Sequence, residues 1–425
     1  MKLCLVENPV IRTHKACANM PEMVSYDTAQ ALLAATLCDL PPIGMERVPT
    51  ALASGRILAE DVHALTPRPE ADISAMDGYA FRSYDMRNAG DIGLPIVGHV
   101  AAGDRPVPLS EGTACLILTG ARIPEGADCV MARERTHVIR NRVTLTDQTA
   151  RVGLNIRREG EEFPLGQCLL QRDQSLDWRH IPLLLSQGIT DVSVYRPITV
   201  SVLANGAEFA SQAEDAREEL NTHMLAAMLR SDTVHVTRQV AASDREEELR
   251  NALLHCVEQS DVIVTTGGIS VGQTDHVLSV LLQLGASCVF RRVSMRPGKP
   301  MTVMRLGRKI VFCLPGNPGA AALCAQLFVI PFLKAMILSS DLPHSGLSMR
   351  GRSTFAYTPP QDATCFLPVS ILQEAGAARF HIVPSVGSSD ILCLTRADGI
   401  MRIDAGQSVQ VGDWSEMLPF TGLRL

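Results

Sequence analysis

The chain has 425 residues, of which 46% are hydrophobic and 20% are charged, and its formal net charge is −6 at pH 7. This composition is typical of a folded globular protein, and the length predicts roughly two to four domains. The acidic balance, the lack of a basic block and an aromatic content of only 4% argue against a nucleic-acid-binding function.

The 12 cysteines predict neither a disulfide framework nor a structural zinc site. None forms a CxxC pair, no histidine cluster lies near them in sequence, and several lie in apolar runs, as Cys256, Cys313 and Cys324 do. We interpret them as reduced, mostly buried thiols of a cytoplasmic protein. The apolar run in residues 1–6 is too short for a signal peptide, and no stretch is expected to reach the uninterrupted length of a membrane-spanning helix.

The first half of the chain predicts helix, then β structure, then helix again. Residues 1–24 show no clear periodicity and are expected to form a loose leader. Residues 25–36 predict a helix capped by Ser25 or Asp27. Residues 66–154 are rich in Pro, Gly and Asp and predict a small β-rich insert domain.

A helix and a strand are expected again within residues 178–194. They are predicted to pack with the first helix, so that residues 25–65 and 155–197 form one discontinuous domain.

From residue 198 onward, strand and helix patterns alternate, which predicts an α/β domain over residues 198–340 with a mostly parallel sheet. The expected strands are residues 198–204, 233–240, 261–266, 288–295, 301–306 and 310–314, and the expected helices are residues 221–230, 244–258, 277–284 and 317–337. Asp244 is the expected N-cap of its helix, with Glu247 in the capping-box position. Residues 341–425 predict a small β-barrel or sandwich, with the barrel preferred.

Three turn-rich clusters are candidate ligand sites. Residues 265–272, with sequence TTGGISVG, follow a buried strand, and their glycines would let backbone N–H groups approach an anion. A plain glycine-rich turn, with Asp275 capping the next helix, explains this cluster equally well.

The second cluster, MRPGKP at residues 295–300, is a rigid turn with two cations, which suits an oxyanion or phosphate. A solvated turn is the preferred interpretation of this cluster alone. The third cluster, LPGNPGA at residues 314–320, leads from a strand into a helix. The free N–H groups at the helix start could bind an anion, and a plain strand–helix connector explains the cluster equally well. All three clusters are expected after successive strands at one sheet edge, where ligands of α/β sheets bind.

Two clusters stand out in the insert, SAMDGYA at residues 74–80 and LTGARIPEGAD at residues 118–128. Asp77 and Asp128 could bind a hard cation, although carboxylates next to glycine are more often turn residues. The acidic run around Gly160 is more typical of a solvated face. No motif indicates a hydrolase.

The motifs SAMDGYA, LTGARIPEGAD, REGEEF, TTGGISVGQTD, RPGKP and LPGNP occur in the order and approximate spacing of the molybdopterin molybdenumtransferase family, which the chain resembles over residues 25–425. That family is related to the C-terminal domain of gephyrin. The resemblance implies a four-domain homodimer with an active site completed by the partner chain. It also implies a cytoplasmic transferase of molybdenum cofactor biosynthesis that inserts molybdate into adenylylated molybdopterin, with Mg²⁺ assisting the release of AMP.

The resemblance assigns roles to individual residues. Asp275 and Asp244 would be the acidic residues that serve magnesium and the reaction, Lys299 would hold the oxyanion, and Asp77 would act from the partner chain. The positions expected to contact the pterin, its phosphates or molybdate are Thr266, Gly267, Gly268, Ser270, Gly272, Pro297, Gly298, Pro300, Gly316, Asn317, Pro318, Thr119, Glu208, Asn221 and Ser388.

The chain departs from the family pattern at positions near these motifs. Ala207 and Glu162 replace aspartates, Arg296 replaces a lysine, and Ala320 and Tyr357 stand where a serine and an arginine are expected. Two alternatives therefore stay open: a diverged paralogue that binds or delivers molybdopterin without efficient metal insertion, and a scaffold protein. The expected partners are small-molecule substrates, a second copy of the chain, the molybdopterin adenylyltransferase and molybdoenzyme apoproteins, but neither nucleic acid nor membrane.

Overall fold

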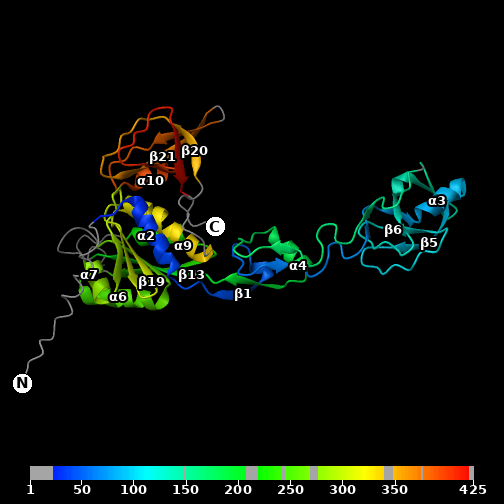
Figure 1. Ribbon diagram of the computed structural model, residues 1–425, viewed down its shortest axis with the longest axis horizontal. Helices are drawn as coiled ribbons and strands as arrows, with labels where there is room; N and C mark the ends of the chain where they lie inside the picture. Colours follow the sequence, from blue (N-terminus) through cyan, green and yellow to red (C-terminus); the bar gives the residue numbers. More distant parts are fainter. Residues whose placement is uncertain are drawn as a thin grey trace, which may run out of the picture. The chain divides into compact units, whose positions relative to one another are not determined.

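The computed structural model describes residues 23–147, 149–206, 219–241, 245–268, 276–338, 348–374 and 377–420. Almost all of the expected leader, residues 1–22, lies outside these ranges. The chain divides into two compact units (Figure 1). The first comprises Met1–Ala59, Ser175–Asp177 and Val192–Leu425, and the second comprises Glu60–Gln174 and Trp178–Asp191.

A six-stranded sheet in the order β14-β13-β15-β19-β18-β16 forms the centre of the first unit. Its strands are β13 (Ile198–Asn205), β14 (Val234–Ala241), β15 (Val262–Thr266), β16 (Ser287–Arg291), β18 (Thr302–Leu306) and β19 (Lys309–Leu314). Strands β14, β13, β15 and β19 run parallel, whereas β18 and β16 are antiparallel to their neighbours. The predicted mostly parallel sheet is therefore confirmed.

Helices cover both faces of this sheet, as the uninterrupted apolar character of its central strands predicts. They are α2 (Tyr26–Cys38), α5 (Asn221–Leu229), α6 (Glu246–Gln259), α7 (His276–Gln283), α8 (Pro318–Cys324) and α9 (Ile330–Leu338). Side chains of α2, α5, α8 and α9 share one apolar cluster with Val200 and Val264. Those of α6 and α7 pack with Leu203, Ile263 and Val311, which lie on the other face (Figure 1).

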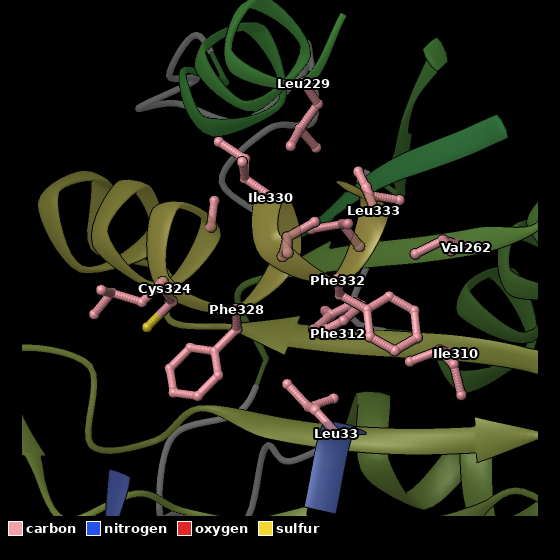
Figure 2. Packing of buried hydrophobic residues seen from close by; sticks show 14 of the residues in the cluster. Leu33, Leu229, Val262, Ile310, Phe312, Cys324, Phe328, Ile330, Phe332 and Leu333 are labelled. Atoms are coloured by element: carbon pink, nitrogen blue, oxygen red, sulfur yellow. The ribbon is translucent and has the colours of Figure 1, made fainter. Parts of the chain in front are cut away.

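The longest apolar helix corrects one expectation. Helix α8, a π-helical segment η5 (Ala325–Val329) and α9 are continuous over Pro318–Leu338, a stretch of 21 residues with a mean hydropathy of 2.0, long and apolar enough to cross a membrane. The expectation that no stretch reaches that length is wrong. Its most apolar window is 78% buried, and Figure 2 shows Phe328, Phe332 and Leu333 in the core, with Phe332 packed edge-on against Phe312. Burial in the core accounts for the apolar composition.

One expected strand is split in two. The strand predicted at residues 288–295 ends as β16 at Arg291, and Arg292 adopts a φ of 58°, which leads the chain out of the sheet. The next segment, β17 (Met295–Arg296), pairs instead with β21 (Thr364–Glu374) of the C-terminal region. The RPGKP turn therefore begins on a strand of a different sheet.

The start of α6 also differs from the prediction. Helix α6 begins at Glu246, and Arg245 occupies its N-cap position without a side-chain capping hydrogen bond. The expected N-cap residue, Asp244, lies outside the described residues. Three glutamates in the first turn supply negative charge at the helix N-terminus in place of a cap.

The C-terminal region is a closed barrel, as predicted. Its strands are β20 (Met349–Ser353), β21, β22 (Ala377–Ile382), β23 (Gly399–Ile403) and β24 (Trp414–Pro419). They pair in the order β21-β22-β20-β24-β23, and β23 pairs back to β21, which closes the ring. Helix α10 (Ile391–Arg396) belongs to the same region.

Strands dominate the second unit, which confirms the β-rich insert. A six-stranded sheet in the order β7-β4-β6-β5-β9-β8 comprises β4 (Gly78–Phe81), β5 (Leu94–Val100), β6 (Ala114–Ile117), β7 (Cys129–Ala132), β8 (Thr136–Ile139) and β9 (Arg142–Leu145). Two short antiparallel pairs are β3 (Ile73–Ser74) with β10 (Ile156–Arg157) and β2 (Val62–His63) with β11 (Cys168–Leu170). The helices of this unit are α3 (Ser83–Ala89) and α4 (His180–Ser186), with short helical turns η2 (Gly90–Ile92) and η3 (Arg133–Arg135).

In the first unit, β1 (Met45–Pro49) pairs with β12 (Asp191–Tyr195), and a short turn η1 (Thr50–Leu52) follows β1.

The predicted cap of α2 is confirmed, because the Ser25 hydroxyl accepts a hydrogen bond from the Thr28 N–H at 3.1 Å.

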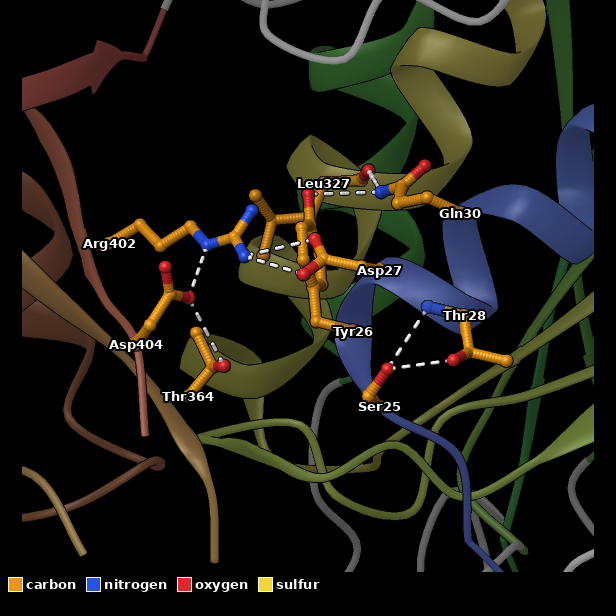
Figure 3. A network of polar contacts seen from close by, with 9 residues as sticks. All are labelled: Ser25, Tyr26, Asp27, Thr28, Gln30, Leu327, Thr364, Arg402 and Asp404. Carbon is orange, nitrogen blue, oxygen red and sulfur yellow. Dashed lines mark hydrogen bonds and ion pairs between the residues drawn. The ribbon is translucent and has the colours of Figure 1, made fainter. Parts of the chain in front are cut away.

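A polar network joins α2 to the barrel (Figure 3). The Arg402 guanidinium of β23 donates to both carboxylate oxygens of Asp27, at 2.9 and 3.0 Å, and to Asp404 at 2.7 Å. It also lies 4.8 Å from the centre of the Tyr26 ring, which is 7% exposed. This contact fixes the barrel against a helix of the α/β core.

We expect Arg402→Met to lower the free energy of unfolding by about 1–2 kcal/mol, because it removes a two-point ion pair and a cation–π contact that solvent only partly screens. Urea denaturation measures the change. The control is Arg350→Met on the barrel surface, whose ion-pair distance to Glu416 is 4.0 Å and which should cost no more than about 0.5 kcal/mol. Equal losses in the two variants would show that the network does not hold the barrel.

Candidate functional site

The glycine-rich turn after β15 has a backbone that only glycine can adopt without strain. Gly267 and Gly268 have φ angles of 84° and 66°. A Cβ atom on Gly267 would lie 2.8 Å from the backbone oxygen of Asn205, and one on Gly268 would lie 2.9 Å from Val277. The end of β13 and the start of α7 thus press closely on this turn, at the carboxyl edge of the parallel strands.

Asn221, the first residue of α5, ties this turn to the strand–helix connection after β19. Its Nδ2 atom donates to the Thr266 hydroxyl at 2.9 Å and to the Gly316 carbonyl at 2.7 Å. The buried Thr266 hydroxyl donates in turn to the Pro315 carbonyl at 3.2 Å. The structure therefore brings the first and third sequence clusters together around one amide.

Two amide oxygens at this edge are buried without a hydrogen-bond partner among the described residues. They are Oδ1 of Asn205, the last residue of β13, and Oδ1 of Asn221. Buried polar atoms are almost always paired, since an unpaired one costs about 1–3 kcal/mol. Each of these oxygens can accept an interaction from a ligand or a cation bound at this edge.

The start of α8 meets the barrel. Asn317 is the N-cap residue, with Pro318 in the first turn, and the Asn317 amide donates to the Ser388 hydroxyl at 2.8 Å. The Gly319 N–H donates to the Ser388 carbonyl at 3.0 Å, and a Cβ on Gly319 would lie 2.8 Å from that oxygen. Ser388 is a predicted site residue of the C-terminal region. The structure thus places it next to the predicted start of α8.

The RPGKP turn packs on α8. Gly298 has a φ of 107°, and a Cβ there would lie 2.8 Å from the Cys324 sulfur. The turn precedes β18, whose first residue, Thr302, pairs with Cys313 near the carboxyl end of β19. The sequence predicts this turn after a strand of the main sheet, and that prediction is wrong, because the turn follows β17, which pairs with β21. The turn still reaches the same edge of the main sheet, because β18 runs antiparallel to β19. Within the turn, the Lys299 side chain is exposed and Pro300 accepts a hydrogen bond from the Thr302 hydroxyl at 3.0 Å.

A cavity of about 300 Å³ lies between this turn, the start of α8 and the barrel. Its polar lining includes Arg296, Tyr357, Ser388 and Asp390, and its apolar lining includes Phe366, Leu367 and Ile400. Pro297 and Gly319 also line it. The cavity therefore combines a cation, a carboxylate, hydroxyl groups and apolar surface, which suits a polar group attached to an organic one.

Tyr357 is neutral in this cavity. Its hydroxyl donates to the Cys365 sulfur at 3.4 Å, and this contact, together with burial, raises the pKa of Tyr357 to about 12. Hydrogen bonds from the backbone N–H groups of Cys393 and Val386 hold the pKa of Asp390 below its usual value. Among the described residues that line the cavity, Arg296 is the cation, and its Nη2 atom lies 3.8 Å from the Asp362 carboxylate.

The predicted insert residues form a tight local pair. The Asp77 carboxylate accepts hydrogen bonds from the Thr119 hydroxyl at 2.6 Å and from the Thr119 N–H at 2.7 Å, which lower the pKa of Asp77. Asp128, by contrast, holds the start of α3 through the N–H and hydroxyl of Ser83. Both Asp128 carboxylate oxygens are therefore used in a structural contact.

Five predicted site residues lie outside the described part of the chain: Glu208, Asp244, Ser270, Gly272 and Asp275. Sequence reasoning missed Asn205, Cys365 and Asp390. Asn205 carried a usable signal, because it is a polar residue at the carboxyl end of a buried parallel strand. No local signal distinguishes Cys365 or Asp390, which reach the cavity only through the path of the barrel strands.

Three family descriptions match successive parts of the chain: "MoeA N-terminal region (domain I and II)" over residues 24–188, "Probable molybdopterin binding domain" over residues 201–335, and "MoeA C-terminal region (domain IV)" over residues 350–420. A molybdopterin molybdenumtransferase of Synechococcus elongatus is 31% identical over 326 residues, covering 74% of this chain and 80% of that protein. Another, from Nostoc sp., is 32% identical over 295 residues, covering 67% of each.

The fold resembles a crystal structure of a molybdopterin biosynthesis MoeA protein from Pyrococcus horikosii, with a TM-score of 0.80 and 26% identity over 94% of this chain and 100% of that one. The sequence matches extend through both units and all three cluster regions. The chain therefore belongs to the molybdopterin molybdenumtransferase family, whose members are transferases of molybdenum cofactor biosynthesis.

Proposed function

We propose that this protein inserts molybdate into adenylylated molybdopterin with release of AMP, as a magnesium-dependent, cytoplasmic homodimer. The observation that carries the proposal is the edge where Asn221 joins the glycine turn to the Gly316 connection, next to the cavity that Arg296 and Ser388 line. One side of this edge suits a phosphate, and the other suits an oxyanion.

The phosphate side is formed by backbone. The left-handed conformations of Gly267 and Gly268, which carry no Cβ atom, leave room for a phosphate to approach main-chain N–H groups, and Gly316 and Pro318 shape the opposite connection. On the oxyanion side, the exposed Lys299 and the cavity-lining Arg296 supply positive charge for molybdate. Ser388, already bonded to Asn317, supplies a hydroxyl.

The donor chemistry of this edge fits Mg²⁺, which takes oxygen ligands. The unpaired amide oxygens of Asn205 and Asn221 are of this kind, and the family pattern adds the carboxylates of Asp275 and Asp244. When bound, magnesium would neutralise charge on the pyrophosphate as AMP leaves.

Other features support the remaining parts of the proposal. All cysteines described are free thiols, which suits a reducing compartment. The names of the curated relatives favour a transferase over a binding-only paralogue or a scaffold. We also propose that the adenylyltransferase supplies the substrate and that molybdoenzyme apoproteins receive the product.

The central experiment incubates the purified chain with adenylylated molybdopterin, molybdate and Mg²⁺, and measures AMP together with reconstitution of an apo-molybdoenzyme. We expect both products, and both should be lost when Mg²⁺ is chelated. Binding of the pterin without AMP release would instead identify a paralogue that holds or delivers it.

A mixing experiment tests the proposed shared site. If Asp77 acts on the Asp275 loop of the partner chain, Asp77→Ala and Asp275→Ala homodimers should both be inactive. Random exchange in an equal mixture should restore about a quarter of wild-type turnover, because half of the dimers then contain one intact site of two. No recovery after verified subunit exchange would place both residues in the same chain's site.

Tyr357 offers a gain-of-function test. Because its phenol stays neutral, it provides at most a neutral hydrogen bond to molybdate. Tyr357→Arg should lower the molybdate concentration for half-saturation about tenfold, the difference of about 1.4 kcal/mol between charge-assisted and neutral hydrogen bonds. Tyr357→Phe is the control for ring packing and should leave half-saturation within about threefold. An unchanged value in Tyr357→Arg would mean that molybdate binds away from this cavity.

A further inference from the structure

We propose that Asp61, His63 and Cys168 form a binding site for a zinc-class divalent metal ion on the second unit. The three residues lie on or beside the short antiparallel pair β2 and β11. Their candidate ligand atoms, one from each residue, all lie within 4.8 Å of one another. They belong to none of the motifs that place the chain in its family.

The strand pairing explains why the residues meet. His63 and Cys168 are direct partners across the antiparallel pair, a position that holds side chains of the same face together. Asp61 precedes β2, and its Oδ1 atom accepts a hydrogen bond from the Arg172 N–H at 2.7 Å. This bond orients the carboxylate, which offers one oxygen to the cluster.

The donor set selects the metal. Zinc accepts sulfur, imidazole nitrogen and carboxylate oxygen together, whereas Mg²⁺ and Ca²⁺ prefer oxygen alone. Zinc bond lengths place tetrahedral donors roughly 3.3–3.6 Å apart, so the side chains need to close by no more than about 1.5 Å. All three side chains are exposed, which makes such rotations inexpensive.

Binding would replace the proton of the Cys168 thiol, which now donates to the Leu170 carbonyl at 3.5 Å, with a metal–sulfur bond. Water would complete the fourth position. Because the ligands come from two strands, the bound ion would crosslink β2 and β11.

Cobalt titration of the full-length, chelator-treated protein tests the proposal, because a thiolate bound to Co²⁺ produces a charge-transfer absorption band. We expect one equivalent of Co²⁺ to produce this band and Zn²⁺ to abolish it by displacement. Cys168→Ser should remove the band, and His63→Gln and Asp61→Asn should each weaken binding at least about tenfold. Cys38→Ser, which removes another exposed cysteine, is the matched control and should bind as the wild type does.

Thermal unfolding provides a second readout that does not depend on sulfur spectroscopy. Zn²⁺ should raise the Tm of the wild type and of Cys38→Ser, but not that of Cys168→Ser, whose circular dichroism should match the wild type. Absence of the cobalt band in the wild type, its survival in Cys168→Ser, or its loss in Cys38→Ser would overturn the proposal. Turnover is not the readout, so this outcome is independent of the proposed transferase reaction.

Discussion

Asn221→Ala is expected to lower kcat/KM for AMP release about tenfold to a hundredfold. The substitution removes the amide that donates to both the Thr266 hydroxyl and the Gly316 carbonyl, and it leaves that carbonyl without its partner. An unpaired buried polar group costs about 1–3 kcal/mol. The glycine turn and the connection at Gly316 can relieve this cost only by moving apart. The turn and the α8 start would then no longer hold their relative positions.

Two further variants separate positioning from packing. Asn221→Asp keeps the shape but cannot donate to Gly316, so it should lose at least as much activity as Asn221→Ala. His223→Ala, on the exposed side of the same helix, is the matched control and should retain wild-type kinetics. Wild-type kcat/KM in Asn221→Ala would show that the hydrogen bonds to the two connections do not contribute to the reaction.

Asp275→Ala is expected to abolish magnesium-dependent turnover while the fold is retained. Asp275 directly precedes α7, which begins at His276, and follows the glycine turn at the edge proposed to bind the pyrophosphate. Removing a metal-ligand carboxylate takes away a charge that water cannot replace, whereas loss of a turn side chain typically costs no more than about 0.5 kcal/mol of stability. Residual AMP release should equal that of wild type under chelation.

The measurement is AMP formation against Mg²⁺ concentration, with unfolding followed in parallel. Asp275→Asn should also be inactive if the negative charge is required. Glu258→Ala, an exposed acidic residue at the end of α6, controls for a general loss of negative charge. If turnover and its magnesium requirement both survive in Asp275→Ala, another carboxylate holds the ion.

Local patterns in the sequence predicted much of the α/β domain. Every residue of β15 is buried, and in the sequence this strand appears as an uninterrupted run of β-branched residues, Val262–Thr266, followed by glycines. Ser25 satisfies the cap of α2 through a residue only three positions away. Helix α6 begins with three glutamates in its first turn, which favour a helix N-terminus through their negative charge. Helix and strand order, turns and the family motifs are therefore determined by neighbouring residues.

The assembly of the site depends on contacts between distant parts of the chain. Ser388 reaches Asn317 only because the barrel docks on α8, and Asn205 faces Gly268 only because β13 and β15 are adjacent in the sheet. His63 and Cys168 meet only through the pairing of β2 with β11. The sequence alone determined which elements form and which family they belong to, since periodicity, caps and glycine turns are local. Only the tertiary structure decided which side chains share the cavity, because long-range pairing depends on the path of the whole chain.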